Sequence, residues 1–414
     1  MGHIDELIAE MCPNGIKYKL FYEVAQYIRG VTYSKDKEVN DGIGGTKLLR
    51  ANNIDLQGNR LDFTDVKVIS KDVKIKESQW LKQNDILICA GSGSKEHIGI
   101  VAYISQDLKS TFGGFMGVIR VDESMILPRY LFHIMVSPIF KEHLTRVSNS
   151  STINNINNDT WARFEIPVPP IEIQQEIVAV LDCFTELEDK LNDELMDRRK
   201  QYQHYLDAYF DGQTENLMQL SELGLLQRGK RFVHADAVES GGVACIHYGE
   251  LYTYYRVYAK TVRSRIREEL RSKMRYAHKG DVIIVGAGEN NIDIGVGVAW
   301  DGDEDVAVHD ACYTLVHNQN PKYISYYLRS SGYHNQIKKY VSEGKICSIS
   351  AEGIGRAIIP IPSVEEQNRI VAELDVFEKI CNDNQYGLPA EILLRKKQYE
   401  YYREKLLAFR KDVN

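Results

Sequence analysis

Apolar residues recur at intervals of three, four or seven positions along two long stretches, about 171–209 and 370–409. Such spacing places them on one face of an α-helix and is typical of a coiled-coil seam. The pattern predicts two long helices, each roughly 38 residues and ~57 Å long at 1.5 Å per residue; Gly387 and Pro389 should interrupt the second. The first seam consists of Ile173, Ile177, Leu181, Phe184, Leu187, Leu191, Leu195, Tyr202, Tyr205 and Tyr209, and the second of Ile370, Leu374, Phe377, Ile392, Tyr399, Tyr402, Leu406 and Phe409.

Outside these stretches the pattern changes to short apolar runs bounded by Gly, Asn and Asp, which predict strands. The clearest are LLRANNI (48–54) and DILICAG (85–91). The stretches 126–144 and 321–340 have helical spacing and follow such runs in the sequence. The globular parts are therefore predicted to be mixed α/β, as two α+β domains.

The chain also repeats itself. IPVPPIEIQQEIVAVLD at 166–182 returns as IPIPSVEEQNRIVAELD at 359–375, and other matches keep the same order. A period of about 195 residues indicates a duplicated domain with its connector and not a solenoid. The predicted parts are a first globular domain (1–165), a first helical region (166–215), a second globular domain (216–357) and a second helical region (358–414).

A helix with one apolar stripe must bury that stripe. Because a globular domain separates the two stripes, the simplest arrangement is an antiparallel coiled coil of both helices with a globular domain at each end. The repeat would then form an internal pseudo-twofold. The alternative is that each helix packs on its own domain.

The net charge of −7 argues at first against nucleic acid, because phosphate neutralisation dominates DNA binding. The charge is unevenly distributed, however. Residues 171–215 hold 4 Lys and Arg against 12 Asp and Glu, whereas 17–165 hold 20 against 17 and 216–355 hold 17 against 16. The excess acid lies in the first helical region, so DNA stays open as a partner of the globular domains.

Composition and motifs narrow the function classes further. No apolar run approaches the roughly 18 to 20 residues of a membrane span, and the seven cysteines are never spaced C-x-x-C, which predicts reduced thiols in a cytoplasm. The Asn-Pro-Pro-aromatic and Asp-Pro-Pro-aromatic motifs of amino-methyltransferases and the GxxxxGK[ST] phosphate loop are missing. Asp301 begins a stretch like a calcium loop, but Val306 and Cys312 stand where Gly and Glu are needed. We therefore expect no catalytic, cofactor or metal site.

The densest basic cluster lies in the segment 256–279. Arginine bonds guanine and phosphate with two parallel hydrogen bonds, so contact with a DNA groove is one interpretation. A solvated helix face is the other, and both stay open.

Polar loops at matching positions of the two copies add further candidates. Small residues allow close backbone approach and Asn can bond adenine edges, although ordinary loops carry the same residues. The DNA-binding candidates are Lys47, Arg50, Asn52, Ser92, Ser94, Lys95, Asn154, Asn155, Lys230, Arg231, His247, Tyr248, Arg256, Lys260, Arg263, Arg265, Asn290, Asn291 and Lys345.

The twin helix starts, the closing GLPAEILLRKKQYEYYREKLLAF, the strands followed by RANNID or HYGEL, and the two D-[IV]-[LI]-I segments together resemble the specificity subunit of type I restriction–modification systems. The resemblance covers nearly the whole chain. It implies two target recognition domains, each reading one half of a bipartite, asymmetric DNA site, joined by two helical regions that form an antiparallel coiled coil. In the first copy, Gln174–Gln175 stands in for the Glu366–Gln367 pair of the second, which predicts a difference in subunit docking.

The resulting hypothesis is a non-catalytic DNA-recognition subunit in a prokaryotic cytoplasm. Its helices would act as a ruler for half-sites roughly one DNA turn, ~34 Å, apart and would dock two modification subunits, with restriction or translocase subunits as further partners. The resemblance implies that adenine-N6 methylation from S-adenosylmethionine and ATP–Mg chemistry belong to those partners. Two other classes stay open: a self-contained methyltransferase or nuclease with unrecognised motifs, and a coiled-coil assembly protein without DNA specificity.

Overall fold

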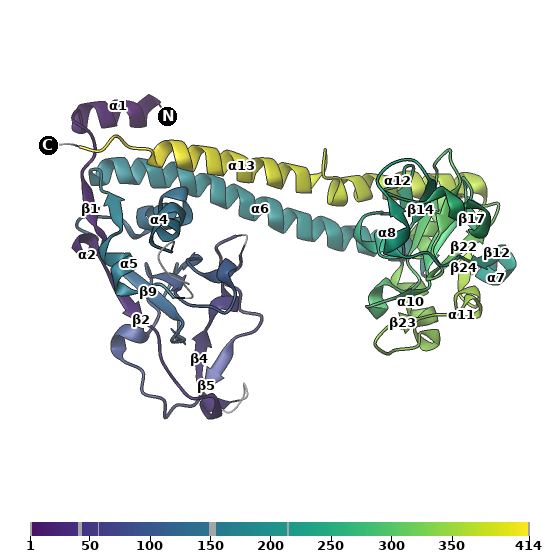
Figure 1. Cartoon of the computed structure of the whole chain (residues 1–414), viewed down its shortest axis with the longest axis horizontal. Helices are drawn as coiled ribbons and strands as arrows, with labels where there is room; N and C mark the ends of the chain where they lie inside the picture. Colours follow the sequence, from purple (N-terminus) through teal and green to yellow (C-terminus); the bar gives the residue numbers. More distant parts are fainter. Residues whose placement is uncertain (1, 40–43, 57, 149–154, 213–214, 413–414) are drawn as a thin grey trace. The chain divides into compact units, whose positions relative to one another are not determined.

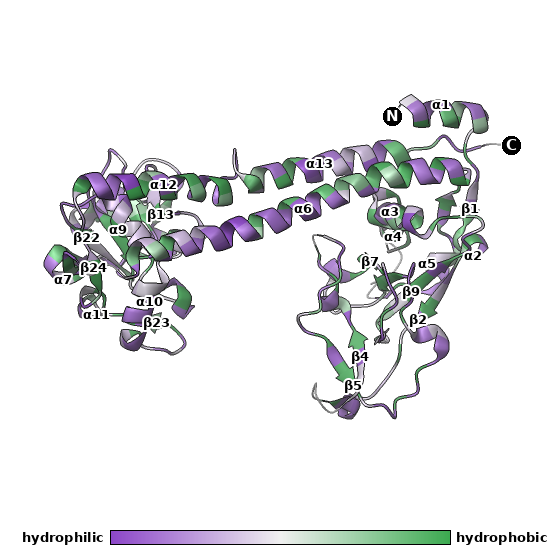
Figure 2. Ribbon diagram, turned by 180° about the vertical axis from the view of Figure 1, so that it is seen from behind, coloured by the Kyte–Doolittle hydropathy of each residue, from purple (hydrophilic) through white to green (hydrophobic). Residues whose placement is uncertain are grey.

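The computed structural model describes residues 2–39, 44–56, 58–148, 155–212 and 215–412. It divides into two compact units: unit 1 comprises residues 1–190 with 392–414, and unit 2 comprises residues 191–391. Each unit holds a globular body and a share of the long helices (Figure 1). The strands are mainly hydrophobic, whereas the helices alternate between hydrophobic and hydrophilic residues (Figure 2). None of the described helices is both long and apolar enough to cross a membrane.

Unit 1 is built on two four-stranded sheets. The first has the order β2-β9-β6-β7 and is antiparallel, and the second has the order β3-β5-β4-β8, in which β4 and β8 run parallel. A further antiparallel pair joins β1 to β10. The strands are β1 Tyr18–Leu20, β2 Ala25–Arg29, β3 Glu38–Val39, β4 Thr46–Leu49, β5 Lys67–Ile69, β6 Ile86–Cys89, β7 Val101–Tyr103, β8 Ser110–Phe112, β9 Met116–Val121 and β10 Glu165–Pro167. β6 confirms the strand predicted at 85–91, whereas the run at 48–54 is a strand only at Leu48–Leu49, the end of β4, and continues as a 3-10 helix at Ala51–Asn53.

Unit 2 repeats this plan with an extra edge strand on each sheet. Its sheets have the orders β12-β22-β18-β20-β15 and β13-β16-β14-β21-β17, and two further pairs join β11 to β24 and β19 to β23. The strands are β11 Leu217–Gln219, β12 Leu225–Arg228, β13 Ala237–Val238, β14 Val243–Ile246, β15 Tyr258–Ala259, β16 Ser264–Ile266, β17 Tyr276–Ala277, β18 Val282–Val285, β19 Ala287–Gly288, β20 Gly297–Trp300, β21 Val306–Val308, β22 Cys312–Val316, β23 Cys347–Ser348 and β24 Ile358–Pro360. The predicted internal repeat is therefore present in the strand order.

The stretches 126–144 and 321–340 are helical, as their spacing predicts, and each is divided into two helices near its middle. In unit 1, Pro138 has no backbone N–H to continue the helix, and the Ser137 hydroxyl donates to Ile134 O at 2.6 Å. The helices are α1 Gly2–Met11, α2 Phe21–Val24, α3 Pro128–Val136, α4 Pro138–Ser148, α5 Asn158–Ala162, α6 Ile171–Phe210, α7 Leu220–Leu223, α8 Glu250–Thr253, α9 Pro321–Tyr327, α10 Ser331–Ile337, α11 Ala351–Gly355, α12 Val364–Asn382 and α13 Leu388–Leu407.

The repeated segment at the start of each long helix fastens that helix to its globular body. In unit 1 the Tyr130 hydroxyl donates to Pro167 O at 3.2 Å, and in unit 2 the Tyr323 hydroxyl donates to Pro360 O at 2.8 Å. These prolines stand at the same position of the two repeats. The segment is repeated because its backbone carbonyls and side chains are needed in both bodies.

The aspartate that closes each repeat makes the second link. Asp182 accepts from Arg129 Nε at 2.7 Å and lies 2.8 Å from His133 Nε2, a fully buried imidazole. Asp375 accepts from Lys322 Nζ and from the Tyr326 hydroxyl, both at 2.7 Å. Because charge-assisted bonds in partly buried sites hold their partners firmly, each helix is tied to the first helix after its sheet.

The comparison of glutamines at the helix starts was wrong. Gln174 is the counterpart of Gln367, since both side chains are fully buried and bond the chain around the first turn in the same way. Ile173, also fully buried, therefore stands where the second copy has the half-buried Glu366. The two copies therefore differ at the residue before this glutamine. In unit 1 that residue, Ile173, enlarges the hydrophobic core.

Within each unit two long helices lie side by side and run antiparallel. In unit 1 the rings of Phe184 on α6 and Tyr402 on α13 stack at 5.2 Å, and Lys396 lies 3.5 Å from Glu188. The alternative, that a long helix packs on its own globular domain, also holds for the first turns of α6. Ile177 and Leu181 are fully buried there in the same core as the sheet.

In unit 2 the rings of Tyr205 on α6 and Phe377 on α12 stack at 5.0 Å, and the Tyr209 hydroxyl bonds Glu373. The second helical region is interrupted between Asn382 and Leu388. This confirms the break expected from Gly387, whose missing Cβ would lie 2.5 Å from Lys379 O.

Candidate nucleic-acid interface

A cavity of about 650 Å³ in unit 1 gathers much of the predicted polar set. It lies where the chain leaves β4, where the loop follows β6, and at the turn between β8 and β9. Its walls include the predicted candidates Arg50, Asn52, Ser92 and Ser94. We refer to it as the Arg50 cavity. Three segments that are far apart in sequence thus present hydrogen-bonding groups to one hollow.

Asp65 positions two of these groups. Arg50 Nη2 and Asn52 Nδ2 both donate to Asp65 Oδ2, each at 2.9 Å. The ion pair is partly exposed, so its contribution to stability is small. Its effect is to hold a guanidinium and an amide side by side at the rim, where both remain able to bond a base edge or a phosphate.

Two polar atoms in the walls of the Arg50 cavity are buried and lack a hydrogen-bond partner among the described residues. They are Arg50 Nε and His97 Nδ1. Buried polar atoms are nearly always bonded, because leaving one unsatisfied costs roughly 1–3 kcal/mol. Both atoms are thus unsatisfied but enclosed by protein, so a ligand could reach them only after a side-chain movement.

Several residues that line the Arg50 cavity are not among the predicted candidates, Arg29 and Phe115 among them. Arg29 lines the cavity and donates from Nε to Gly114 O at 3.3 Å, and Phe115 stands at its edge with 68 % of its surface exposed. Arg29 could have been found, because the Arg-Gly pair recurs as Arg228–Gly229 in the second copy. Phe115 has no such signal, since an isolated exposed aromatic cannot be recognised from sequence.

The other candidates of the first copy are distributed around the same region. Asn155 is exposed and forms a β-bridge with Gly91 at the cavity wall. Lys47 is exposed on β4, and Lys95 begins a short 3-10 helix in the loop after β6. Asn154 lies outside the residues that the structure describes.

The same place in unit 2 is occupied by aromatic rings. His247 and His309 lie 4.6 Å apart between ring centroids, with Tyr248 5.5 Å and Phe232 4.9 Å from His309. Burial lowers the pKa of both imidazoles; Glu250 opposes the shift at His247, and His247 adds to it at His309. Neutral imidazoles can donate and accept hydrogen bonds. The candidates His247 and Tyr248 are thus brought together, with Lys230 and Arg231 exposed on the chain beside Phe232.

The basic segment 256–279 is not a helix face. It forms β15, β16, a 3-10 helix at Glu268–Lys273 and β17. Several of its charges are paired with nearby carboxylates: Lys260 with Asp301, Arg265 with Glu304, Arg267 with Asp236, Arg271 with Glu268 and Lys279 with Asp303. Arg263 instead lies over the Tyr254 ring at 4.9 Å. The segment therefore offers DNA fewer uncompensated charges than its sequence indicates.

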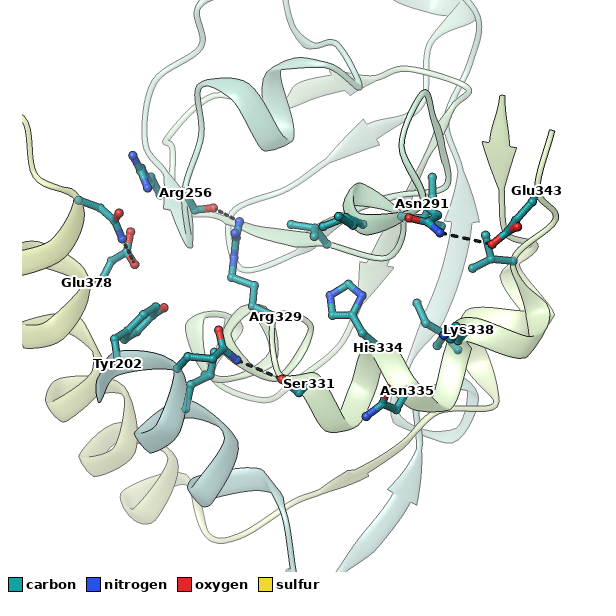
Figure 3. Close-up of a pocket in the computed structure, with 18 residues that line it drawn as sticks. Tyr202, Arg256, Asn291, Arg329, Ser331, His334, Asn335, Lys338, Glu343 and Glu378 are labelled. Atoms are coloured by element: carbon teal, nitrogen blue, oxygen red, sulfur yellow. Dashed lines mark hydrogen bonds between the residues drawn. The ribbon is translucent and has the colours of Figure 1, made fainter. Parts of the chain in front are cut away.

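A second hollow in unit 2, of about 570 Å³, takes in Arg256 and Asn291 (Figure 3). It lies among α6, α10 and α12, where Arg329 Nη2 donates to Arg256 O at 2.5 Å and Asn291 Nδ2 donates to Glu343 Oε1 at 3.3 Å. Asn290 bonds Asp293 nearby, and Lys345 is exposed on the loop that follows Glu343. The candidates of the second copy are thus divided between this hollow and the His247–His309 rings.

The acidic stretch that begins at Asp301 forms ion pairs. Among the residues that the structure describes, no three His, Cys, Asp or Glu side chains are arranged to hold a metal ion. The aspartates after residue 300 instead pair with the basic segment, as Lys260 does with Asp301.

Comparison with known proteins bears on both units. A family model described as the type I restriction modification DNA specificity domain matches twice, at residues 14–197 and 214–394. A protein of Haemophilus influenzae described as a putative type I restriction enzyme specificity subunit is 29% identical over 293 residues, 68% of this chain and 72% of that protein. The EcoR124I/EcoR124II specificity subunit of Escherichia coli is 28% identical over 326 residues, 75% of this chain and 78% of that protein.

A shorter match is closer in sequence. The EcoKI specificity subunit of Escherichia coli K12 is 35% identical over 163 residues, which are 38% of this chain and 34% of that protein. A chain from a solved type I R-M system has a TM-score of 0.63 at 16% identity, over 95% of this chain and 97% of that one. At that identity the likeness is one of fold.

Proposed function

The chain belongs to the type I restriction–modification specificity family, and from this premise we propose that unit 1 and unit 2 each read one half of a bipartite DNA site. The chain is the non-catalytic DNA-recognition subunit of such a system and assembles with its other subunits. The self-contained enzyme and the assembly protein without DNA specificity are not favoured by any observation.

One observation supports the proposal that the two units read different half-sites. The two bodies share one strand order, yet different side chains stand at the same place: Arg50 follows β4 in unit 1, and His247 follows β14 in unit 2. Their equivalence is local as well, since Arg50 N donates to Asn53 Oδ1 and His247 N donates to Glu250 Oε2. Base edges are distinguished by side-chain donors and acceptors. Two equal scaffolds with unequal side chains would read unequal sequences.

The partners are proposed more finely. Two modification subunits would bind the helical regions, whose acidic stretch 171–215 leaves carboxylates such as Glu172 and Asp193 exposed. The modification subunits would hold S-adenosylmethionine. Restriction or translocase subunits, where these are present, would hold ATP–Mg. The named relatives are bacterial, and we place the complex in a prokaryotic cytoplasm, beside its DNA.

The test is to express the full chain with its modification partner and to map methylated adenines in the host DNA. The expected result is an asymmetric motif of two short halves separated by a fixed spacer. Arg50→Ala should relax one half, and His247→Ala should relax the other, because each removes base-edge bonds in one unit. Methylation without sequence preference, or variants that relax both halves alike, would contradict the proposal.

A further inference from the structure

The walls of the Arg50 cavity are suited to a flat ring. Tyr33 and Phe115 line the cavity with aromatic side chains, and Phe115 is 68 % exposed. Hydrogen-bonding side chains line the same cavity, including Arg50, Asn52 and Ser92. A simple anion would leave the apolar walls unused. A nucleobase has stacking faces for the rings and edge atoms for the polar groups.

The Phe115 ring is exposed although its backbone is firmly held. Its carbonyl accepts from both Ala90 N and Gly91 N at 2.9 Å, and Gly114 O accepts from Arg29 Nε. Holding the backbone reduces the conformational entropy that the ring would lose on binding. Phe115 is therefore prepared to contact an aromatic partner at the edge of the cavity.

The two units differ by three substitutions in one turn at this place. A Cβ on Gly30 would lie 2.1 Å from Gly113 O, and a Cβ on Gly229 would lie 2.3 Å from His309 O. The same close approach in both units makes Gly113 the counterpart of His309. The turn Gly113–Gly114–Phe115 thus corresponds to His309–Asp310–Ala311.

The consequence is a difference in space at equivalent positions. In unit 1 the absence of a side chain at Gly113 leaves the hollow open beside Leu48. In unit 2 the His309 ring packs against Phe232 and His247 where that opening would be, and Ala311 offers no aromatic face. The two units therefore differ in shape as well as in hydrogen bonding.

We propose that the Arg50 cavity receives one nucleobase turned out of the DNA duplex, and that unit 2 reads its half-site with every base stacked. This inference rests on the proposed function and adds to it a base-binding site in one unit. Phe115 takes up stacking contact with the displaced base or its neighbour. Arg50 and Asn52, which Asp65 holds side by side, bond the base edge, while Arg29 and Lys35 at the cavity supply charge for the adjoining phosphates. The base is one other than the methylated adenine, which the modification subunit handles.

The experiment uses the full chain assembled with its modification subunit and a duplex of the mapped site. 2-Aminopurine replaces each purine in turn, pyrrolocytosine replaces each cytosine, and permanganate reports unstacked thymines. Three variants are compared: Phe115→Ala, Gly113→His, which copies the residue of unit 2, and Phe63→Ala, a control. Gly113 accepts a side chain sterically, because its added Cβ would meet Leu48 at 3.4 Å, an ordinary contact. Phe63 is 53% exposed in the same unit and does not line the Arg50 cavity.

We expect one position of the half-site read by unit 1 to gain about threefold or more in probe signal on binding. Phe115→Ala and Gly113→His should abolish that gain, while Phe63→Ala should keep it. An abasic site at that position should tighten binding by the wild type, because no base then has to be unstacked.

Three outcomes overturn the inference while leaving the proposed function intact. They are selective binding without a signal at any position other than the target adenine, an equal signal in both halves, and a signal that Gly113→His does not change. A complex without any sequence selectivity would instead refute the proposed function itself. The two failures are therefore distinguishable in one series of measurements.

Discussion

Gln174 and Gln367 perform the same task in their respective units. Gln174 Oε1 accepts from Leu127 N at 2.8 Å and its Nε2 donates to Pro169 O at 2.8 Å; Gln367 Oε1 accepts from Asn320 N at 3.0 Å and its Nε2 donates to Pro362 O at 2.9 Å. Both side chains are fully buried. Each amide thus joins the loop before the first helix after the sheet to the chain entering a long helix. The repeated segment is kept in both copies by this shared connection.

Gln174→Leu should destabilise unit 1 strongly. The change leaves Leu127 N without its acceptor and the carbonyls of Met125 and Pro169 without their donor, in a buried site. We expect a loss of about 2–4 kcal/mol in the free energy of unfolding, measured by urea denaturation of the full chain. Gln175→Leu is the matched control, since Gln175 is exposed and should change stability by less than about 0.5 kcal/mol. Equal effects of the two variants would contradict the assignment.

Arg263→Ala and Arg265→Ala should differ in DNA binding although the residues are near neighbours. Arg265 is held by Glu304 at 2.5 Å and donates to Gly242 O, so a phosphate would have to compete with both. Among the described residues Arg263 has no carboxylate as an ion-pair partner, and it rests on the Tyr254 ring. We expect Arg263→Ala to reduce the slope of log K against log salt by about 1 and Arg265→Ala by clearly less. A titration of the assembled complex at several salt concentrations measures both, and the reverse order would show that the ion pair does not govern availability.

His317 should make unit 2 less stable in mild acid. Burial lowers its pKa to about 4, and its Nδ1 accepts from Gln319 N at 3.1 Å. The unfolded imidazole has a pKa of about 6.5, so between pH 6.5 and about 4 the unfolded state binds the proton more readily. The free energy of unfolding should therefore fall as the pH is lowered, by about 2 kcal/mol between pH 7 and pH 5 from this residue alone.

His317→Asn provides the comparison for that measurement. Asn keeps an acceptor for Gln319 N but does not titrate in this range. The difference in stability between wild type and variant should shift in favour of the variant as the pH falls from 7 to 5. A constant difference across this range would exclude His317 as the source.

A four-residue insertion in α6 after Lys190 tests whether this helix sets the spacing of the half-sites. Four residues add about 6 Å to a helix, close to two base pairs at about 3.4 Å each. We expect the mapped methylation motif to keep both halves and to change its spacer. A four-residue insertion after Gly241 is the control, because Gly241 has positive φ and open space around it. An unchanged spacer in the α6 variant, with activity retained, would refute the role of the helix as a ruler.

The sequence by itself determined the repeat, the long helices with their break near Gly387, and two of the strands. These features depend on periodicity and on residues close together in the chain. They can be recognised in the sequence because side chains repeat with a fixed period in helices and strands. The helical spacing at 126–144 and 321–340 did not show that each stretch is two helices, because one residue, such as Ser137 bonding Ile134 O, can end a helix whose spacing continues. The family was identifiable because the repeated segments carry contacts needed in both copies.

Only the tertiary structure decided which polar residues can meet a ligand. Arg265 loses its availability to Glu304, 39 positions away, and Arg50 is aligned by Asp65, 15 positions away. The cavity beside Gly113 in unit 1 and the packed His309 ring at the equivalent place in unit 2 depend on neighbours from other strands. Charge pairing and space are properties of residues brought together by folding, so the sequence listed the candidates and the fold selected among them.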